Sequence, residues 1–340
     1  MMSNTLVQYV RLGKSGLRVS VPIFGAMSVG SPKWMPWVLE EEESLKVLKA
    51  AWDRGINSFD TANVYSNGES EKLIAKFIET NKIPRNEILI LTKCTGLVHK
   101  DVSVRGALHP ELQDTREYVN QAGLSRAAIF NAVEASLTRL NTTYIDLLQI
   151  HRFDPKVEPE EIMKALHDLV QSGKVRYLGA SSMRTWQFAL LNEVAGKNGW
   201  TKFVSMQNEY SLLYREEERD MNAYCNYHGI GIIPWAPVAA GLLARPVGES
   251  TTRSESANRV VSEADKIIIQ RVQEIAEKKG KTMAQVASAW VNAKVSSPII
   301  GLSSEKRIEE AIGINGLNLT EEEAKYLEEP YQPKAVRGHA

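Results

Sequence analysis

The chain has 340 residues, a length that suits either two ordinary domains or one large α/β barrel. Lysine plus arginine number 41, as do aspartate plus glutamate, and this zero net charge argues against a general nucleic-acid or membrane-surface binder. Hydrophobic residues make up 43% of the chain and charged residues 24%, a composition that favours a large packed core over disorder.

Short apolar runs rich in β-forming residues alternate with amphipathic helical stretches along the chain. Ahead of them, residues 9–20 predict a hairpin that could plug the bottom of a barrel. Strands are expected at 21–24, 56–60, 87–93, 144–151, 175–181, 202–207, 230–236 and 297–301. Helices are expected at 41–54, 69–80, 125–140, 158–172, 185–195, 215–228, 264–279, 282–294 and 304–314.

Eight strands followed by helices in one continuous series favour a closed (β/α)8 TIM barrel, formed as a single domain over residues 1–340. A Rossmann domain is disfavoured, because no G-x-G-x-x-G motif follows the first strand. Two connections, 96–124 and 239–263, are too long to be plain linkers. Each follows a predicted strand, so both should lie at the C-terminal face of the barrel, and loops of this length are usually either functional lids or disordered.

The two cysteines, Cys94 and Cys225, lie far apart, and no nearby cysteine or histidine makes a metal-ligand spacing. We therefore expect two reduced thiols in a cytoplasmic protein and no metal site. The first residues contain no long apolar stretch, and the chain has no apolar run of about 20 residues. Neither a secretory signal nor a membrane span is expected.

Four titratable residues stand at or just beyond predicted strand ends. Asp60, Lys93 and His151 each close a strand, and Tyr65 lies in the loop after Asp60. Active sites of TIM barrels lie at the C-terminal strand ends, so these side chains should converge. Each residue alone is more typical of a helix cap, a solvated rim position or a structural histidine. Their occurrence together favours a catalytic group.

The four side chains suit the reduction of a carbonyl group, which needs a hydride donor and a proton donor. A free tyrosine titrates near pH 10, too high for an ideal acid at neutral pH, and a neighbouring ammonium stabilises the phenolate. We therefore assign Tyr65 as the acid and Lys93 as the group that tunes it. Asp60 would supply the counter-charge of the lysine, and a neutral His151 would orient the substrate carbonyl.

Residues 55–78 (GINSFDTANVYSNGESEKLIAKFI) resemble the aldo-keto reductases, whose signature is Asp-Thr-Ala with a tyrosine five residues after the aspartate. LTK at 91–93 and DLLQIHRFD at 146–154 match the other two segments of the catalytic tetrad. The similarity extends from about residue 9 to 330 and is greatest to fungal members, including aryl-alcohol dehydrogenases and versiconal hemiacetal acetate reductases. Further matching motifs lie at 173–182, 206–218, 232–243 and 299–312.

The resemblance implies a barrel that binds NADP(H) in an extended form and transfers hydride from nicotinamide C4 to a carbonyl, with Tyr65 as proton donor. Arg307 is the candidate for the 2′-phosphate, because a guanidinium can bind it bidentately. The cofactor contacts implied are Ser181, Ser182 and Gln207 at the carboxamide, Trp235 stacked on the nicotinamide, Ala236, Val238, Gly241 and Leu242 near the pyrophosphate, and Gly301, Ser303, Arg307, Glu310 and Ala311 at the adenosine end.

Some positions depart from the pattern of the family. Ser182 stands where many members have asparagine, and Ala236 stands where serine is common. Gly301 and Ala311 stand where some members have lysine and asparagine. The strictness of the preference for NADP over NAD is therefore left open.

The resemblance places the substrate pocket among residues after the strands and in the variable loops. The candidates are Met27, Trp34, Trp37, Val64 and Tyr214, together with the 96–124 loop. An aromatic and apolar lining suits a small aromatic or hydrophobic aldehyde or ketone, although the tryptophans could equally just pack the barrel mouth.

Two other functions compete with that of a carbonyl reductase. Channel β-subunits share this barrel and its cofactor site, so a cofactor-binding regulatory subunit is the main alternative, against which the complete tetrad argues. A metal-dependent barrel isomerase would need several inward carboxylate or histidine ligands, and only Asp60 and His151 qualify.

Overall fold

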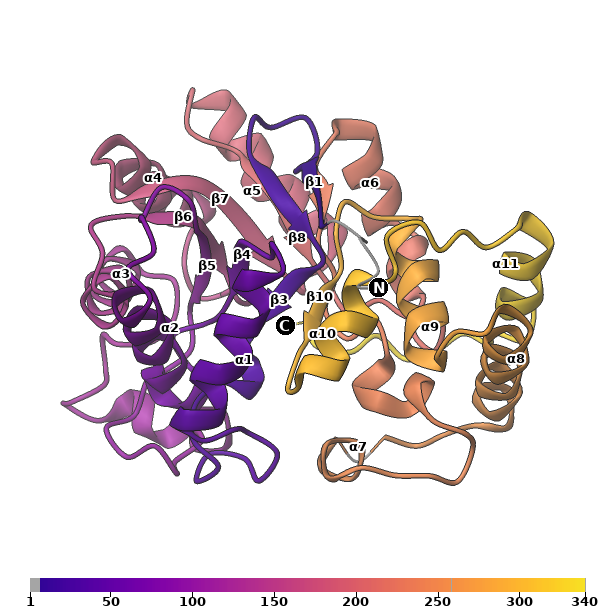
Figure 1. Ribbon diagram of the computed structural model, residues 1–340. Helices are drawn as coiled ribbons and strands as arrows, with labels where there is room; N and C mark the ends of the chain where they lie inside the picture. The colour runs from indigo at the N-terminus through magenta and orange to yellow at the C-terminus, as the bar shows by residue number, and fades with distance from the viewer. Residues whose placement is uncertain (1–6, 258, 340) are drawn as a thin grey trace.

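The computed structural model describes residues 7–257 and 259–339. Eight parallel strands pair in the order β10-β3-β4-β5-β6-β7-β8-β9, which confirms the predicted (β/α)8 barrel. The strands surround the centre of the molecule and the helices cover their outer side (Figure 1). The strands are β3 Ile23–Gly25, β4 Ser58–Asp60, β5 Leu89–Cys94, β6 Ile145–Ile150, β7 Val175–Ser181, β8 Phe203–Gln207, β9 Gly231–Ile232 and β10 Ile299–Gly301.

Two backbone hydrogen bonds close the ring between the β9 and β10 segments, which stand at the two ends of this strand order. The amide of Ile299 donates to the carbonyl of Pro234 at 2.9 Å, and that of Ser296 donates to Ile232 at 3.0 Å. The strand predicted at 230–236 is nevertheless only Gly231–Ile232. Proline has no amide to donate to a neighbouring strand, and Ala236 has φ +57°, so regular pairing stops after Ile232.

The strands alternate with helices along the chain, as the periodicity predicts. In α4 the apolar side chains of Ile162, Leu166 and Leu169 are buried, because residues three or four apart share one helix face. All six residues of β6 are buried, as expected of a parallel strand covered on both sides. The helices are α1 Glu41–Asp53, α2 Glu69–Thr80, α3 Arg126–Leu140, α4 Pro159–Gln171, α5 Thr185–Lys197, α6 Met221–His228, α7 Thr252–Ser256, α8 Glu263–Lys279, α9 Met283–Asn292, α10 Glu305–Ile312 and α11 Glu321–Glu328.

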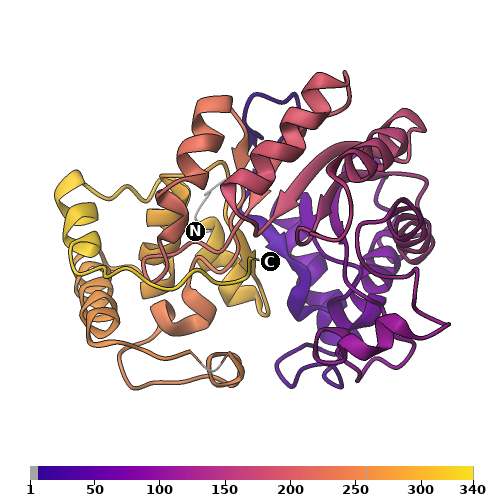
Figure 2. The same cartoon turned by 180° about the vertical axis from the view of Figure 1, so that it is seen from behind.

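The predicted hairpin is confirmed and covers the N-terminal end of the barrel. Strands β1 (Gln8–Arg11) and β2 (Arg18–Val21) pair antiparallel. Leu12 packs in one buried cluster with Leu91 and Leu147 of the barrel strands. Figure 1 shows the hairpin at the end of the barrel opposite α7, and Figure 2 shows the same arrangement from behind.

Two more predicted elements differ from the structure, and one helix was not predicted. The strand predicted at 21–24 begins only at Ile23, because Val21 pairs within the hairpin. The helix predicted at 215–228 begins at Met221, and a single 3-10 turn, Glu216–Glu218, precedes it. Helix α11 was not predicted, although Thr320 and Glu323 form a capping box, which typically marks the start of a helix.

The two long connections lie at the same end of the barrel as α7 (Figures 1 and 2). The 96–124 connection contains 3-10 turns at Gly106–Leu108 and Pro110–Asp114. The 239–263 connection contains a 3-10 turn at Ala239–Ala244 and the short helix α7. Both therefore have local structure, and both lie at the C-terminal ends of the barrel strands, as predicted.

Candidate active site

Lys93 and Asp60 form a buried ion pair at the C-terminal ends of β5 and β4. The lysine Nζ lies 2.6 Å from Asp60 Oδ1 and donates a second hydrogen bond to the carbonyl of Thr61 at 2.7 Å. Burial alone would lower the pKa of Lys93, but the Asp60 carboxylate and the Tyr65 oxygen outweigh it and raise that pKa. Lys93 is therefore a charged ammonium at neutral pH.

The hydroxyl of Tyr65 lies beside this ammonium. Lys93 Nζ is 3.4 Å from Tyr65 Oη, within hydrogen-bonding distance. Tyr65 begins a 3-10 turn after β4 in which Ser66 and Asn67 both have positive φ. This tight turn directs the tyrosine ring back over the strand ends, and the ring keeps partial exposure.

His151 follows β6 and completes the group. Its ring meets the Tyr65 ring edge-on, with centroids 6.1 Å apart. Its backbone amide donates to the carbonyl of Cys94 at 2.9 Å, which holds it against the end of β5. Burial, and then the positive charges of Lys93 and Arg152, lower the pKa of His151 well below its ordinary value. The imidazole is therefore neutral at physiological pH.

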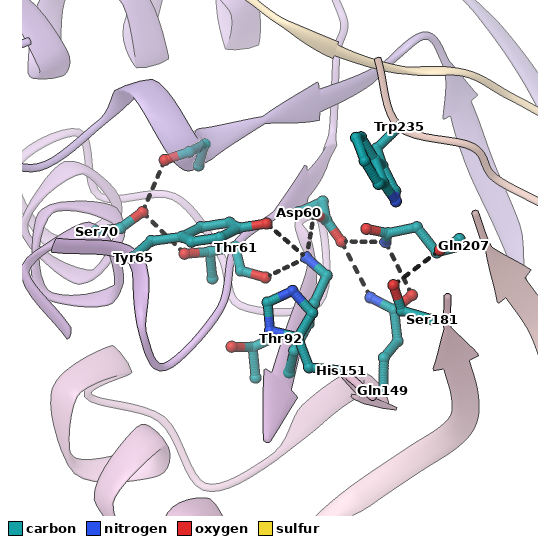
Figure 3. A network of polar contacts seen from close by, with 12 residues as sticks. Asp60, Thr61, Tyr65, Ser70, Thr92, Gln149, His151, Ser181, Gln207 and Trp235 are labelled. Carbon is teal, nitrogen blue, oxygen red and sulfur yellow. Dashed lines mark hydrogen bonds and ion pairs between the residues drawn. The ribbon is translucent and has the colours of Figure 1, made fainter. Parts of the chain in front are cut away.

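The second oxygen of Asp60 accepts from two buried amide side chains. Gln149 Nε2 donates to Asp60 Oδ2 at 3.0 Å, and Gln207 Nε2 donates to the same oxygen at 2.8 Å (Figure 3). Gln207 Nε2 also lies 2.9 Å from Gln149 Oε1. These bonds fix the carboxylate that faces Lys93. Gln149 was missed by the sequence analysis, although a lone amide within the apolar run LLQI was a visible signal.

Ser181, Ser182 and Trp235 lie next to this amide cluster. Ser181 Oγ donates to the carbonyl of Gln207 at 2.8 Å, and Ser182 N donates to Asn208 Oδ1 at 3.2 Å. The indole Nε1 of Trp235 donates to Ser182 Oγ at 3.2 Å. The four positions predicted to hold the nicotinamide therefore lie together, on β7, β8 and the segment after β9.

Several non-glycine residues at this mouth of the barrel have a positive φ. Among non-glycine residues, Ser66, Thr95, Ser182 and Ala236 have φ of 49°, 121°, 43° and 57°. They follow β4, β5, β7 and β9 respectively. Such costly conformations are typical of functional sites, where the surrounding structure maintains them.

The residues predicted for the adenosine end lie after β10 and on α10. Arg307 is exposed, and its Nη1 donates to Ser303 Oγ at 2.7 Å. It forms no ion pair with any residue in 7–257 or 259–339. At Gly301, nothing lies within 4 Å of the position that a Cβ would take. A guanidinium without a carboxylate partner, a hydroxyl and open space fit the phosphate end of a nucleotide. Glu310 is half-buried and Ala311 is buried on the same helix.

The segment after β9 contains the residues predicted to lie along the pyrophosphate. Val238, Gly241 and Leu242 are all half-buried, so part of each is open to a ligand. Gly241 has φ +102° and lies opposite the Thr251 hydroxyl, close to the start of α7. The 239–263 connection therefore folds back over these positions.

The predicted pocket residues divide into two groups. Trp34 lies close to the catalytic tyrosine candidate. Its ring centroid is 6.2 Å from that of Tyr65 and 6.4 Å from that of Trp37. Met27 and Val64 are half-buried at the same mouth. Tyr214 differs, because it is fully buried and its ring lies under the guanidinium of Arg337, 4.6 Å from the ring centroid.

A C-terminal segment, residues 331–339, covers this side of the mouth and was missed by the sequence analysis. Tyr331 Oη and the amide of Lys334 both donate to Glu216 Oε1, at 2.6 and 2.8 Å. The amide of Arg337 donates to Tyr214 Oη at 2.9 Å. The motifs that carried the family resemblance end at about residue 330, so no signal pointed to this segment.

The end of this segment reaches the candidate nicotinamide site. A Cβ added at Gly338 would lie 3.8 Å from Trp235 Cζ2 and 3.9 Å from Ser182 Cβ. It would lie 3.7 Å from Arg152 Nη2. Figures 1 and 2 agree in placing the end of the chain near the centre of the barrel.

Over residues 7–257 and 259–339, no three histidine, cysteine, aspartate or glutamate side chains are grouped so that they could bind a metal ion. Within the same ranges, no helix has the length and apolar character needed to cross a membrane.

Comparison with known proteins agrees with this geometry. A sequence profile described as "Aldo/keto reductase family" matches residues 23–332. The chain is 55% identical to the aldo-keto reductase dtxS3 of Metarhizium robertsii, over 100% of this chain and 95% of that protein. It is 49% identical to the versiconal hemiacetal acetate reductase of Aspergillus parasiticus, over 97% and 98% of the two chains. It is 50% identical to a putative aryl-alcohol dehydrogenase, C977.14c, of Schizosaccharomyces pombe, over 97% of each chain.

Proposed function

The chain belongs to the aldo/keto reductase family, whose members are oxidoreductases acting on carbonyl and alcohol groups, and we propose that it reduces aldehydes or ketones with NADPH. One observation carries this proposal. Lys93 Nζ lies within hydrogen-bonding distance of both the Asp60 carboxylate and the Tyr65 hydroxyl. This is the arrangement needed for a tyrosine that releases its proton to a developing alkoxide.

Tyr65 is the proton donor in this proposal. As its proton leaves, negative charge develops on Oη, and the ammonium 3.4 Å away stabilises that charge. Asp60 keeps the ammonium charged although it is buried, and the two glutamine amides hold the carboxylate in position. His151, being neutral, has one N–H to offer to the substrate oxygen, which it would orient toward Tyr65.

The cofactor is assigned to the residues along β7, β8, the segment after β9 and α10. Ser181, Ser182, Gln207 and Trp235 would hold the nicotinamide, and Arg307 with Ser303 would bind the 2′-phosphate. When bound, reduced NADP supplies a hydride from C4 of its nicotinamide. The carbonyl carbon gains the hydride and the carbonyl oxygen gains the Tyr65 proton, so the product is an alcohol.

The substrate in this proposal is an aromatic or hydrophobic carbonyl compound. Trp34 lies beside Tyr65 and Trp37 lies beside Trp34, and the two indoles offer apolar surface. One relative is named for aryl alcohols and another for versiconal hemiacetal acetate, and the aryl-alcohol name supports an aromatic substrate. We also propose a cytoplasmic location for the protein, because Cys94 and Cys225 are free, buried thiols, as is usual in a reducing compartment.

A carbonyl panel assayed with NADPH and with NADH tests the proposal. Activated aromatic aldehydes such as 4-nitrobenzaldehyde should be reduced, with NADPH consumed in equal amount and faster than NADH. Tight NADPH binding without consumption for any carbonyl would contradict the proposal and favour the alternative, a cofactor-binding regulatory subunit of the channel β-subunit type.

A further inference from the structure

Arg152 is a cation at the active-site mouth to which the proposed reaction gives no role. It directly follows His151, and its Nη1 donates to the carbonyl of His151 at 2.5 Å. The guanidinium is thereby folded over the end of β6, beside the imidazole. On the other side its Nη2 lies close to Gly338, which in turn borders Trp235 and Ser182. Arg152 therefore borders the space where a substrate would meet His151.

The charge of Arg152 has no carboxylate partner in the described chain. No aspartate or glutamate of residues 7–257 and 259–339 forms an ion pair with it. The nearest acidic residue in sequence, Asp154, is already used, since its Oδ2 accepts from the amide of Leu124 at 2.9 Å and its Oδ1 from that of Lys156 at 3.0 Å.

Two neighbouring basic groups on the same rim have acidic partners. Arg337 Nη2 lies 3.0 Å from Glu209 Oε1, and His339 Nε2 lies 2.8 Å from Glu217 Oε1. Arg152 has no such partner among the described residues, and burial lowers its pKa. Arg253 has none there either, but its guanidinium lies over the Trp37 ring, 3.9 Å from the centroid. An enclosed and unpaired guanidinium is costly unless an anion neutralises it, and its planar fork matches a carboxylate or phosphate.

The strand order indicates which of these anions would reach Arg152. The residues assigned to the cofactor phosphates follow β9 and β10, whereas Arg152 follows β6. In the ring order β10-β3-β4-β5-β6, β6 is four strands from β10, which is across the mouth of an eight-stranded barrel. The phosphate end of the cofactor is thus on the far side, and a carbonyl substrate held at the neighbouring His151 is better placed to bring an anion to Arg152.

We propose that Arg152 is a specificity residue that selects carbonyl substrates bearing a carboxylate group. This inference rests on the proposed reductase function and narrows its substrate class to oxo acids and formyl acids. Arg152 holds the carboxylate while His151, its neighbour in the chain, orients the carbonyl oxygen. The aromatic surface of Trp34 and Trp37 accepts the rest of the molecule.

Matched acids and esters test the role of Arg152. The probes are benzoylformate against methyl benzoylformate, and 4-carboxybenzaldehyde against methyl 4-formylbenzoate. They place the carboxylate next to the carbonyl or across a ring. Wild-type kcat/KM should favour the acid of at least one pair. In Arg152→Gln, kcat/KM for that acid should fall by about 10- to 100-fold, the range of a lost hydrogen bond to a charged group, mainly through KM. The ester should be nearly unaffected.

Two further variants separate specificity from structure. Arg152→Lys keeps the charge but loses the planar fork, so it should retain part of the preference for the acid. Arg176→Gln removes an exposed arginine at the start of β7, at the opposite end of the barrel. It should leave kcat/KM unchanged for both the acid and the ester of a pair. NADPH binding, followed by fluorescence, should be the same in all of these variants.

The possible outcomes distinguish the two proposals. Equal kcat/KM for acids and esters in the wild type, or equal losses for both in Arg152→Gln, would overturn the role of Arg152 while leaving the reductase function intact. Failure of the wild type to reduce either ester or acid would instead contradict the reductase function itself. If Arg152→Gln does not fold, the wild-type preference and the Arg152→Lys variant decide the question.

Discussion

The ammonium of Lys93 lies 2.6 Å from the carboxylate of Asp60, and these residues are 0% and 2% exposed. An ion pair so deeply buried contributes little net stability, because desolvation of both charges offsets their attraction. Its retention in the barrel mouth is better explained by chemistry: it keeps a positive charge next to the hydroxyl of Tyr65. Removing either partner alone should therefore affect both stability and turnover.

Asp60→Asn should lower the free energy of unfolding by about 3–5 kcal/mol, because it leaves Lys93 buried and charged without a counter-ion. Adding Lys93→Met to this variant should restore much of the loss, since no buried charge then remains. Urea unfolding at neutral pH measures both effects. Glu42→Gln, which removes one half of an exposed helical ion pair, is the control and should leave stability nearly unchanged. A double variant no more stable than Asp60→Asn would contradict this account.

Tyr65→Phe should lower kcat for carbonyl reduction by at least about 100-fold, because it removes the proposed general acid. The affinity for NADPH should stay within a small factor of the wild type. Steady-state kinetics and a fluorescence titration measure the two quantities. Tyr227→Phe, at a tyrosine that is 83% exposed, is the matched control. Full activity in Tyr65→Phe would rule out the acid assignment.

Arg307→Ala should weaken NADPH binding by about 10- to 100-fold, because a charged hydrogen bond to the 2′-phosphate is lost. NADH has no such phosphate, so its affinity should change much less. Fluorescence titrations with both cofactors give the ratio of the affinity for NADPH to the affinity for NADH in each variant. Lys325→Ala, at an exposed lysine of α11, controls for the loss of one positive charge. Equal losses for the two cofactors would refute the assignment.

The lowered pKa of His151 predicts a dependence of stability on pH. In the unfolded chain this histidine gains a proton below about pH 6.5, while in the folded protein it stays neutral to lower pH. The unfolded state then binds more protons, so this contribution to stability is complete above pH 6.5 and is lost as the pH falls. Relative to His151→Gln, the wild type should lose up to about 1.4 kcal/mol per pH unit below that point.

Urea unfolding from pH 8 to pH 5 measures this difference. His228→Gln, at an exposed histidine at the end of α6, is the matched control for the replacement of a histidine by glutamine. Parallel pH profiles for the wild type and His151→Gln would mean that the imidazole takes up its proton as easily in the folded protein as in the unfolded one.

Local periodicity was enough to predict most of the fold. Strand β7 and helix α2 lie at the predicted bounds, because each apolar pattern there is uninterrupted and has clear ends. One of the errors comes from contacts that are distant in sequence. The predicted helix at 215–228 starts late because Glu216 bonds to Tyr331 and Lys334 of the C-terminal segment, more than a hundred residues away. No local pattern records such a partner.

The candidate site, like the fold, could be predicted from the sequence only in part. The sequence singled out Asp60, Tyr65, Lys93 and His151 by their placement at predicted strand ends and by the family resemblance of the surrounding motifs. Parallel strands of a barrel end at one face, so polar residues at those ends converge. Only the tertiary structure decided that the imidazole is neutral and that Asp60 is held by Gln149 and Gln207, because burial and side-chain hydrogen bonds depend on packing between strands.

The position of Arg152 also had to come from the structure. In the sequence it is one arginine among 41 basic residues, next to a candidate histidine. Its significance arises because Asp154 bonds to backbone amides elsewhere and because Gly338 of the C-terminal segment closes over it. Whether a charge is paired depends on distances across the folded chain, and neither composition nor spacing determines those distances.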